Sequence, residues 1–207
     1  MALVYQQDIN EHTKIAVWLI DEPASYFLNR VSPLKKISHP LKNIQHLAAL
    51  NLLLELHPDF PFQQIQLSDS GKPFLKDSAY FFSIAHAGNY AAVITSKTQT
   101  VGIDIESNHN KANLVANKFL SENEQEMIRD FSDELLVNNT MAWTIKEALY
   151  KLDGRGGLRF KEQIIINEIS NQNKSIISKC ELRLDTILSM EVHSIKINEL
   201  FLSWVVN

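Results

Sequence analysis

The sequence predicts an α+β fold, in which helices pack on antiparallel sheets. Strand-like runs and helical patterns occur in both halves of the 207 residues, and short connections separate several of the strand-like runs. Short connections favour antiparallel neighbours. Apolar residues make up 45% of the chain, so a substantial core can form.

The N-terminal part predicts a strand followed by two helices. Residues 14–20 form an apolar run typical of a buried strand. Pro23 indicates a short helix, because proline is tolerated in the first turn. A longer helix is expected to have its N-cap at Ser38, with Pro40 just inside it, and to end at His57, which precedes a proline.

The middle of the chain predicts strands joined by tight turns. Residues 62–67 are expected to form a strand with Ile65 and Leu67 directed inward, and residues 69–71 have turn chemistry. Three further strand-like runs follow, at 80–85, 91–96 and 101–106. The connections between them are short, which predicts an antiparallel meander.

The remaining chain predicts helices and then further strands. One helix is expected over 113–119, and the capping-box pattern of Ser121 and Glu124 predicts the start of a second, short helix. A third helix is expected over 133–152, with Gly154 available to end it. Strand-like runs follow at 163–169, 175–184, 191–197 and 200–206.

The composition excludes several classes of protein. The net charge of -4 argues against a general binder of nucleic acid or anionic membranes, but it is compatible with a local basic pocket for phosphates. Cys180 is the single cysteine, so neither an intrachain disulfide nor a cysteine-based zinc site is expected. The sequence shows no signal-peptide pattern and no apolar run of membrane-spanning length, so a cytoplasmic protein is expected.

The strand predicted at 101–106 carries two carboxylates on one face. Its branched apolar residues alternate with Gly102, Asp104 and Glu106, so Asp104 and Glu106 point the same way. Two such carboxylates repel each other by roughly 3 kcal/mol at about 6 Å and an effective dielectric constant of about 20. A partly buried acidic face would need a cation such as Mg²⁺, Mn²⁺ or Ca²⁺. An ordinary amphipathic strand with a solvated acidic face fits the same pattern.

The long helix predicted over 133–152 carries a stripe of chemically distinct side chains. Trp143, Glu147 and Lys151 are spaced i, i+4, i+8 and therefore share one helix face. An aromatic ring, a carboxylate and an ammonium group in a row fit a catalytic site. The same spacing also fits a surface ion pair between Glu147 and Lys151, so the helix alone leaves both interpretations open.

Together, the strand and the helix resemble the signatures of the 4′-phosphopantetheinyl transferase family. The family has a G-I/V-D-I/V-E strand and a W-x-x-K-E-A-x-x-K helix, which match residues 102–106 and 143–151 here. Residues 71–75 are similar to its G-K-P element, and residues 82–87 are similar to its F-N-x-S-H-S element. The order and spacing of the four segments also match, from about residue 65 to about residue 160.

The resemblance implies a particular architecture. The longer single-chain members, of the surfactin-synthetase-activating type, consist of two similar α+β halves, each an antiparallel sheet with packed helices. Residues 1–102 would form the N-terminal half, and residues 103–207 would form the C-terminal half with the metal site. The active site would lie between the halves, and a monomer is expected because both halves are in one chain.

The resemblance also implies an activity. The family transfers the 4′-phosphopantetheine arm of coenzyme A to a serine of an acyl or peptidyl carrier protein and releases adenosine 3′,5′-bisphosphate. Neither nucleic acid nor a membrane takes part. The attacking serine belongs to the carrier protein, so the enzyme needs no nucleophile of its own. The chemistry consists mainly of positioning and charge neutralisation, with a divalent ion on the diphosphate.

The resemblance assigns roles to individual residues. Three carboxylates would hold Mg²⁺ or Mn²⁺: Asp104, Glu106 and Glu147. Glu147 would also accept the serine proton, directly or through a water. Lys151 would neutralise charge on the transferring phosphate. Three residues of the N-terminal half would bind coenzyme A together with Lys151: Lys72, Pro73 and His86. Trp143 is expected to pack rather than react.

This chain departs from the family pattern at two places. Ala85 and Ala87 flank His86 where the family has serines, and the first long helix has Leu50 and Asn51 where an arginine is usual. These differences keep a second hypothesis open, in which the protein is a weak or inactive paralogue that binds a nucleotide or a carrier protein. Carriers of fatty-acid, polyketide, peptide-synthetase and lysine pathways are all compatible with the sequence.

Overall fold

The structure is a computed structural model that describes residues 2–76, 79–107, 110–132, 135–172 and 175–207. The chain divides into two compact units, Met1–Val101 and Gly102–Asn207. Both units combine helices with antiparallel strand pairs, so the predicted α+β class is confirmed. The division lies one residue before the boundary that the sequence predicts.

The first unit is built on an antiparallel sheet with the strand order β1-β2-β6-β5. Its strands are β1 (Leu3–Asp8), β2 (Thr13–Leu19), β5 (Phe81–Ala87) and β6 (Tyr90–Ser96). These bounds confirm the strand predicted at 14–20 and the first two strands of the predicted meander. A separate two-stranded sheet contains β3 (Ile65–Leu67) and β4 (Pro73–Leu75).

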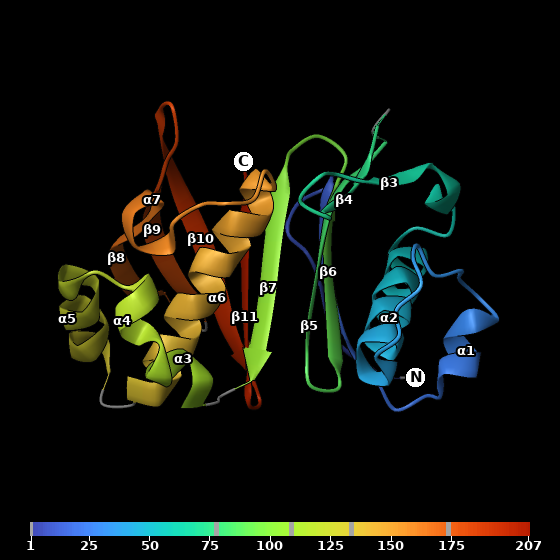
Figure 1. Cartoon of the computed structure of the whole chain (residues 1–207), viewed down its shortest axis with the longest axis horizontal. Coiled ribbons are helices and arrows are strands. Elements are labelled where there is room, and N and C mark those ends of the chain that lie inside the picture. The colour runs from blue at the N-terminus through green and yellow to red at the C-terminus, as the bar shows by residue number, and fades with distance from the viewer. Residues whose placement is uncertain (1, 77–78, 108–109, 133–134, 173–174) are drawn as a thin grey trace. The chain divides into compact units, whose positions relative to one another are not determined.

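Helix α2 (Pro40–Leu56) covers one face of the four-stranded sheet, and the short α1 (Ala24–Leu28) packs beside it (Figure 1). The N-cap of α2 is His39 and not the predicted Ser38. The extended backbone of His39 places its Nδ1 atom 3.4 Å from the backbone N–H of Lys42, which donates to it. The helix ends before His57, as predicted, because His57 is extended ahead of Pro58.

The strand predicted over 62–67 is wrong in its first half. Residues Phe62–Gln64 form a 3₁₀ turn, η1, and only Ile65–Leu67 are extended. Leu67 is 41% exposed and does not point into a core, because β3 pairs only with β4 and takes no part in the larger sheet. Alternation alone could not distinguish this small hairpin from a core strand.

The second unit is built on a sheet with the order β7-β11-β10-β9-β8. Its strands are β7 (Val101–Ser107), β8 (Ile164–Gln172), β9 (Ser175–Arg183), β10 (Ile187–Ile197) and β11 (Leu200–Val206). The predicted meander is therefore wrong for its third strand, because β7 neighbours β11 and not β6. The short connection before Val101 permits a hairpin but does not require one, and pairing with a strand a hundred residues later leaves no local signal.

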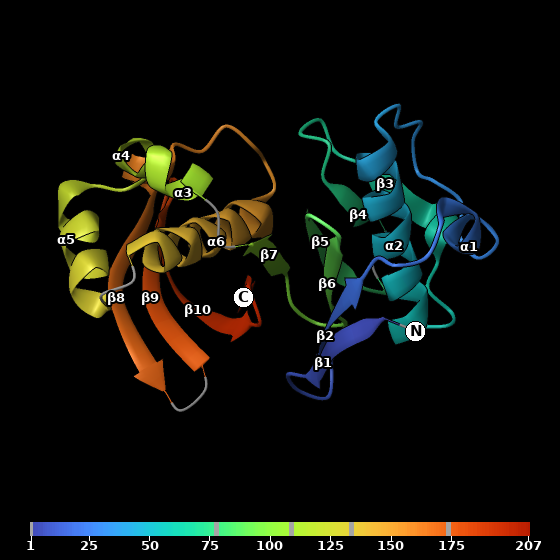
Figure 2. The same ribbon diagram turned by 90° about the horizontal axis from the view of Figure 1, so that it is seen from below.

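Helix α6 (Leu135–Asp153) covers one face of this sheet (Figure 2). It confirms the predicted long helix, whose expected first two residues, 133–134, lie outside the described residues. The helix predicted over 113–119 is divided at Val115 into α3 (Asn110–Leu114) and α4 (Ala116–Phe119). Two further helices complete the unit, α5 (Glu122–Phe131) and α7 (Phe160–Gln163).

The predicted capping box and helix stop are both present in the second unit. Ser121 accepts a hydrogen bond from the backbone N–H of Glu124, and the Glu124 side chain accepts one from the backbone N–H of Ser121. Gly154 follows α6 with a φ of 70°, a left-handed conformation that favours glycine. None of the described helices combines the length and apolar character needed to span a membrane.

Candidate active site

Strand β7 and helix α6 approach each other backbone to backbone at Gly102. A Cβ atom built on this glycine would lie 2.0 Å from the carbonyl oxygen of Ala148 and 2.8 Å from the backbone nitrogen of Leu152. Any other residue would therefore force the strand away from the helix. The glycine sets the spacing between the strand that carries Asp104 and the helix that carries Glu147 and Lys151.

Asp104 and Lys151 form an ion pair across this contact. The Oδ1 atom of Asp104 lies 2.6 Å from the Nζ atom of Lys151, and Asp104 is only 6% exposed. Burial raises the pKa of the Asp104 carboxyl, and the ammonium group of Lys151 opposes this shift. The Lys151 side chain is 27% exposed, so an anion from solution can also reach it.

Glu147 lies in the same electrostatic environment. Burial raises the pKa of Glu147 to about 7, and the negative charges of Asp104 and Glu106 add to the increase while Lys151 opposes it. Glu106 is half-buried at the end of β7, where its Oε1 atom accepts a hydrogen bond of 3.3 Å from the backbone N–H of Ser107. The structure therefore brings four predicted site residues of the second unit together: Asp104, Glu106, Glu147 and Lys151.

The carboxylates have the chemistry of a magnesium site but not yet the arrangement of one. Within the described part of the chain, no group of three or more histidine, cysteine, aspartate or glutamate side chains is arranged to hold a metal ion. Asp104 instead binds Lys151. The negative charges of Asp104 and Glu106 nevertheless raise the pKa of Glu147, and a cation would relieve this repulsion. Oxygen ligands of this type fit Mg²⁺, so the metal assignment stays a prediction.

An apolar cavity of about 360 Å³ opens beside Glu106. Helix α6 contributes Trp143, and the remaining lining residues come from α3 and the residue after it: Lys111, Ala112, Leu114 and Val115. The indole of Trp143 also stacks on Phe160, with ring centroids 5.5 Å apart, and meets the edge of Phe119. Trp143 is thus a packing residue that forms one wall of a cavity.

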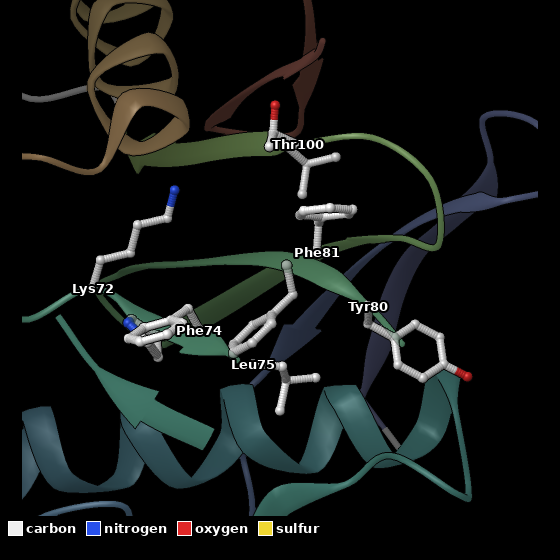
Figure 3. Close-up of a pocket in the computed structure, with 9 residues that line it drawn as sticks. Lys72, Phe74, Leu75, Tyr80, Phe81 and Thr100 are labelled. Carbon is white, nitrogen blue, oxygen red and sulfur yellow. The ribbon is translucent and has the colours of Figure 1, made fainter. Parts of the chain in front are cut away.

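The first unit holds a second cavity, of about 170 Å³, at the β3–β4 hairpin. Lys72 and Pro73 line it, together with aromatic and apolar side chains of β4, β5 and the chain before β7 (Figure 3). The Nζ atom of Lys72 points away from the Phe74 ring (Figure 3). The backbone N–H of Lys72 donates to the Ser68 hydroxyl at 3.1 Å, which fixes the turn around Gly71. The structure therefore places Lys72 and Pro73 at one pocket.

His86 lies elsewhere in the first unit, exposed near the end of β5. It shares a strand face with Phe82 and Ile84, which pack against α2. Burial lowers the pKa of His46 in α2, and the charges of Lys35 and His86 lower it further. These three basic residues therefore lie in one electrostatic environment at the N-terminal half of α2.

The two places where the chain departs from the family pattern lie away from this basic group. Ala85 and Ala87 are buried on the opposite face of β5 from His86, because successive strand residues point to opposite faces. Leu50 and Asn51 are fully buried in α2. His46, whose pKa the charges of Lys35 and His86 lower, is a basic residue near His86 that the sequence interpretation missed.

Comparison with known proteins shows which family the second unit resembles. The family model described as the 4′-phosphopantetheinyl transferase superfamily matches residues 100–200, which contain β7 and α6 with all four clustered site residues. The 4′-phosphopantetheinyl transferase AcpT of Escherichia coli O157:H7 is 32% identical over 130 residues. Over residues 100–200 the chain is similar to the 4′-phosphopantetheinyl transferase superfamily.

Other relatives in the superfamily are similar over parts of their length. The putative 4′-phosphopantetheinyl transferase slr0495 of Synechocystis is 30% identical over 128 residues, which are 58% of this chain and 52% of the relative. The 4′-phosphopantetheinyl transferase HetI of Nostoc is 32% identical over 99 residues, 44% of this chain and 42% of the relative. For AcpT the shares are 61% and 65%, so the chain covers less than two thirds of each of these relatives.

The superfamily helix motif contains a second lysine, Lys146, whose role the sequence interpretation missed. Lys146 is fully buried, and its Nζ atom lies 2.7 Å from Oε1 of Glu124. It also donates to the carbonyl oxygens of Phe119 and Phe160, at 2.8 and 3.0 Å. Burial lowers the pKa of Lys146, and the Glu124 carboxylate opposes that shift.

Glu124 connects three elements of the second unit. It caps α5, pairs with Lys146 of α6, and accepts a hydrogen bond of 2.9 Å from the backbone N–H of Ile166 in β8. The capping-box pattern predicted the first of these contacts. The other two join residues far apart in the sequence, so only the folded chain reveals that Lys146 is a structural residue and not a solvent-exposed cation.

Proposed function

We propose that the protein transfers the 4′-phosphopantetheine arm of coenzyme A to a serine of an acyl or peptidyl carrier protein. The observation that carries the proposal is the convergence of Asp104, Glu147 and Lys151 where β7 meets α6. This convergence lies inside the region matched by the family model. The names of the relatives AcpT and HetI, both 4′-phosphopantetheinyl transferases, support the same reaction.

The proposed step is a displacement at phosphorus. The serine oxygen of the carrier forms a bond to the phosphorus that bears the pantetheine group, and the bridging bond of the diphosphate breaks. Adenosine 3′,5′-bisphosphate leaves with the bridging oxygen. The serine proton passes to the carboxylate of Glu147, directly or through a water. Lys151, which is partly exposed beside Asp104, neutralises negative charge on the transferring phosphate.

Asp104, Glu106 and Glu147 are the residues that would hold Mg²⁺ or Mn²⁺. A bound divalent ion supplies charge neutralisation on the diphosphate. The ion pair between Asp104 and Lys151 must share the Asp104 carboxylate with that ion. The ion pair uses the Oδ1 atom of Asp104.

Coenzyme A would use the first unit through two groups of residues. The cavity at Lys72 and Pro73 is bordered by aromatic rings, which suit the flat base of the nucleotide (Figure 3). His86 would bind a phosphate of coenzyme A, and His46 and Lys35 lie in the same electrostatic environment. These basic residues take the place of the missing arginine.

The finer architecture is part of the proposal. We place the protein in the longer single-chain branch, with the halves 1–102 and 103–207 related to each other. A helix-covered antiparallel sheet in each unit supports this assignment. The proposal also includes a monomeric, cytoplasmic enzyme of the holo-carrier-protein synthase type.

The second candidate is a paralogue that binds a nucleotide or carrier protein without transferring the arm. Its support was the loss of serines at positions 85 and 87. Both alanines are buried on the face of β5 opposite His86, which weakens that support. The intact set of Asp104, Glu106, Glu147 and Lys151 favours the active enzyme.

Mass spectrometry of carrier proteins tests the proposal. The protein is incubated with coenzyme A, Mg²⁺ and a panel of apo-carriers from fatty-acid, polyketide and peptide synthesis, and the carriers are weighed. We expect at least one carrier to gain one phosphopantetheine arm, and Glu147→Gln to abolish the gain. Unchanged mass for every carrier, together with binding of coenzyme A to the wild type, would favour the paralogue.

A further inference from the structure

A chain of buried hydroxyl groups connects α6 to the sheet beneath it. The Oγ1 atom of Thr144 in α6 lies 2.7 Å from Oγ of Ser203 in β11, and Ser203 lies 2.8 Å from Oγ of Ser194 in β10. Thr144 also donates to the carbonyl oxygen of Met141, at 2.8 Å. All three hydroxyl residues are 0% exposed.

The direction of these hydrogen bonds follows from the number of protons. Each hydroxyl has one hydrogen, and a carbonyl oxygen can only accept. Because Thr144 gives its hydrogen to Met141, it accepts the hydrogen of Ser203, and Ser203 in turn accepts the hydrogen of Ser194. The chain therefore has one defined arrangement, which holds the helix at one rotation over the two strands.

Stability alone does not account for this chain. Replacing both partners of a buried hydrogen bond by apolar groups of the same shape is close to neutral. Apolar contacts are also non-directional, so they would allow α6 to rotate or slide slightly over the sheet. Hydroxyl groups accept only a narrow range of distances and angles, and they fix the helix more closely.

The position of Thr144 connects this restraint to the candidate site. Thr144 and Ala148 lie on the sheet-facing side of α6, and Ala148 contacts Gly102 of β7. Glu147 and Lys151 flank the same side of the helix, and Lys151 reaches Asp104. Rotation of α6 would move both side chains relative to β7.

We infer that Thr144 is a positioning residue, whose hydroxyl contact to Ser203 and Ser194 fixes the rotation of α6 and so aligns Glu147 and Lys151 with Asp104. The inference about alignment rests on the geometry of the second unit. Its consequence for turnover rests on the proposed transferase function. The two are therefore tested by separate measurements.

The first measurement does not depend on activity. The coupling free energy between Asp104 and Lys151 is determined from the unfolding of Asp104→Asn, Lys151→Met and the double variant. The cycle is then repeated in a Thr144→Val background. We expect the coupling to fall to less than half its original value in Thr144→Val and to return in Thr144→Ser, which restores the hydroxyl.

A matched control comes from the first unit. Thr13 is also 0% exposed, and its Oγ1 atom donates to Oγ of Ser96 at 3.0 Å. Thr13→Val removes a buried threonine–serine pair without touching α6, so the coupling between Asp104 and Lys151 should stay unchanged. If Thr144→Val folds poorly, Thr144→Val combined with Ser203→Ala and Ser194→Ala removes all three hydroxyl groups of the chain, so none of them is left unpaired.

The second measurement is the steady-state kinetics of arm transfer. Misalignment should lower kcat by about tenfold or more in Thr144→Val while KM for coenzyme A changes little, and Thr144→Ser should recover the rate. Unchanged coupling in both the Thr144→Val protein and the Thr144→Val/Ser203→Ala/Ser194→Ala protein would overturn the inference. If the wild type transfers nothing but the coupling falls as expected in Thr144→Val, only the proposed function is contradicted.

Discussion

At the scale of single residues, the absence of a side chain at Gly102 controls how closely β7 approaches α6. We predict that Gly102→Ala destabilises the protein by about 3 kcal/mol, because its Cβ would overlap the Ala148 carbonyl. Urea unfolding checks this. Gly88→Ala is the control. Gly88 lies at a turn, and no atom beyond its chain neighbours lies within 4 Å of a Cβ built on it, so only its φ of 52° opposes alanine and the cost should be about 1 kcal/mol. Equal losses in the two variants would contradict the close-packing explanation.

A buried histidine makes the stability of the first unit depend on pH. His57 is 8% exposed, and its Nε2 atom lies 2.9 Å from the Thr95 hydroxyl. Burial lowers the pKa of His57, and Lys14 and Lys97 lower it further, while Asp59 opposes them. At a pH above the pKa that His57 has in the unfolded chain, the histidine is neutral in both the folded and the unfolded state. As the pH falls below about 6.5, only the unfolded state gains the proton, so the folded state becomes less stable. When the pH is lowered from about 7.5 to about 5, the urea midpoint should fall less in His57→Gln than in the wild type.

At the scale of elements, a buried ion pair joins α5, α6 and β8. We predict that Lys146→Met costs about 3–5 kcal/mol, because Glu124 would remain buried without its cation. Adding Glu124→Gln should recover part of that loss in thermal unfolding. The exposed pair of Lys179 and Glu168, 2.8 Å apart, provides the control, and Lys179→Met should leave the midpoint almost unchanged. A Lys146→Met protein as stable as Lys179→Met would mean that the pair does not support the scaffold.

The elements themselves show where sequence patterns are sufficient. The capping box at Ser121 and the glycine after α6 involve residues within a few positions of each other, and both were predicted correctly. The pairing of β7 with β11 was not, because the partner strand lies about a hundred residues away and short connections favour the wrong neighbour. The prediction that Leu67 points inward was wrong for a related reason, because alternation of apolar and polar residues does not reveal which sheet a strand joins.

At the scale of the whole molecule, the site residues could be named from motifs, but their environment could not. The motifs contain Asp104, Glu147 and Lys151, and the structure places these three together. The pairing of Lys146 with Glu124 and the hydroxyl chain at Thr144 depend on contacts between distant segments. The sequence patterns around those residues are compatible with solvent exposure, so their burial becomes visible only in the folded chain.

The response of the whole molecule to Mg²⁺ decides whether the acidic cluster is a metal site. If Asp104, Glu106 and Glu147 hold Mg²⁺, the ion stabilises the folded state by about 1.4 kcal/mol at about ten times its Kd. Asp104→Ala should lose this gain in melting temperature and lower the transfer rate by about a hundredfold, because the charge on the diphosphate is then poorly neutralised.

Asp130→Ala is the matched control for the Mg²⁺ experiment. Asp130 is exposed in α5, so this variant removes the same charge from a site that should hold no ion, and its Mg²⁺ response and transfer rate should equal those of the wild type. A cluster that is only a repulsive acidic surface predicts a different pattern. Asp104→Ala would then relieve repulsion, keep the Mg²⁺ response of the wild type and transfer the arm at the wild-type rate, and that result would defeat the metal assignment.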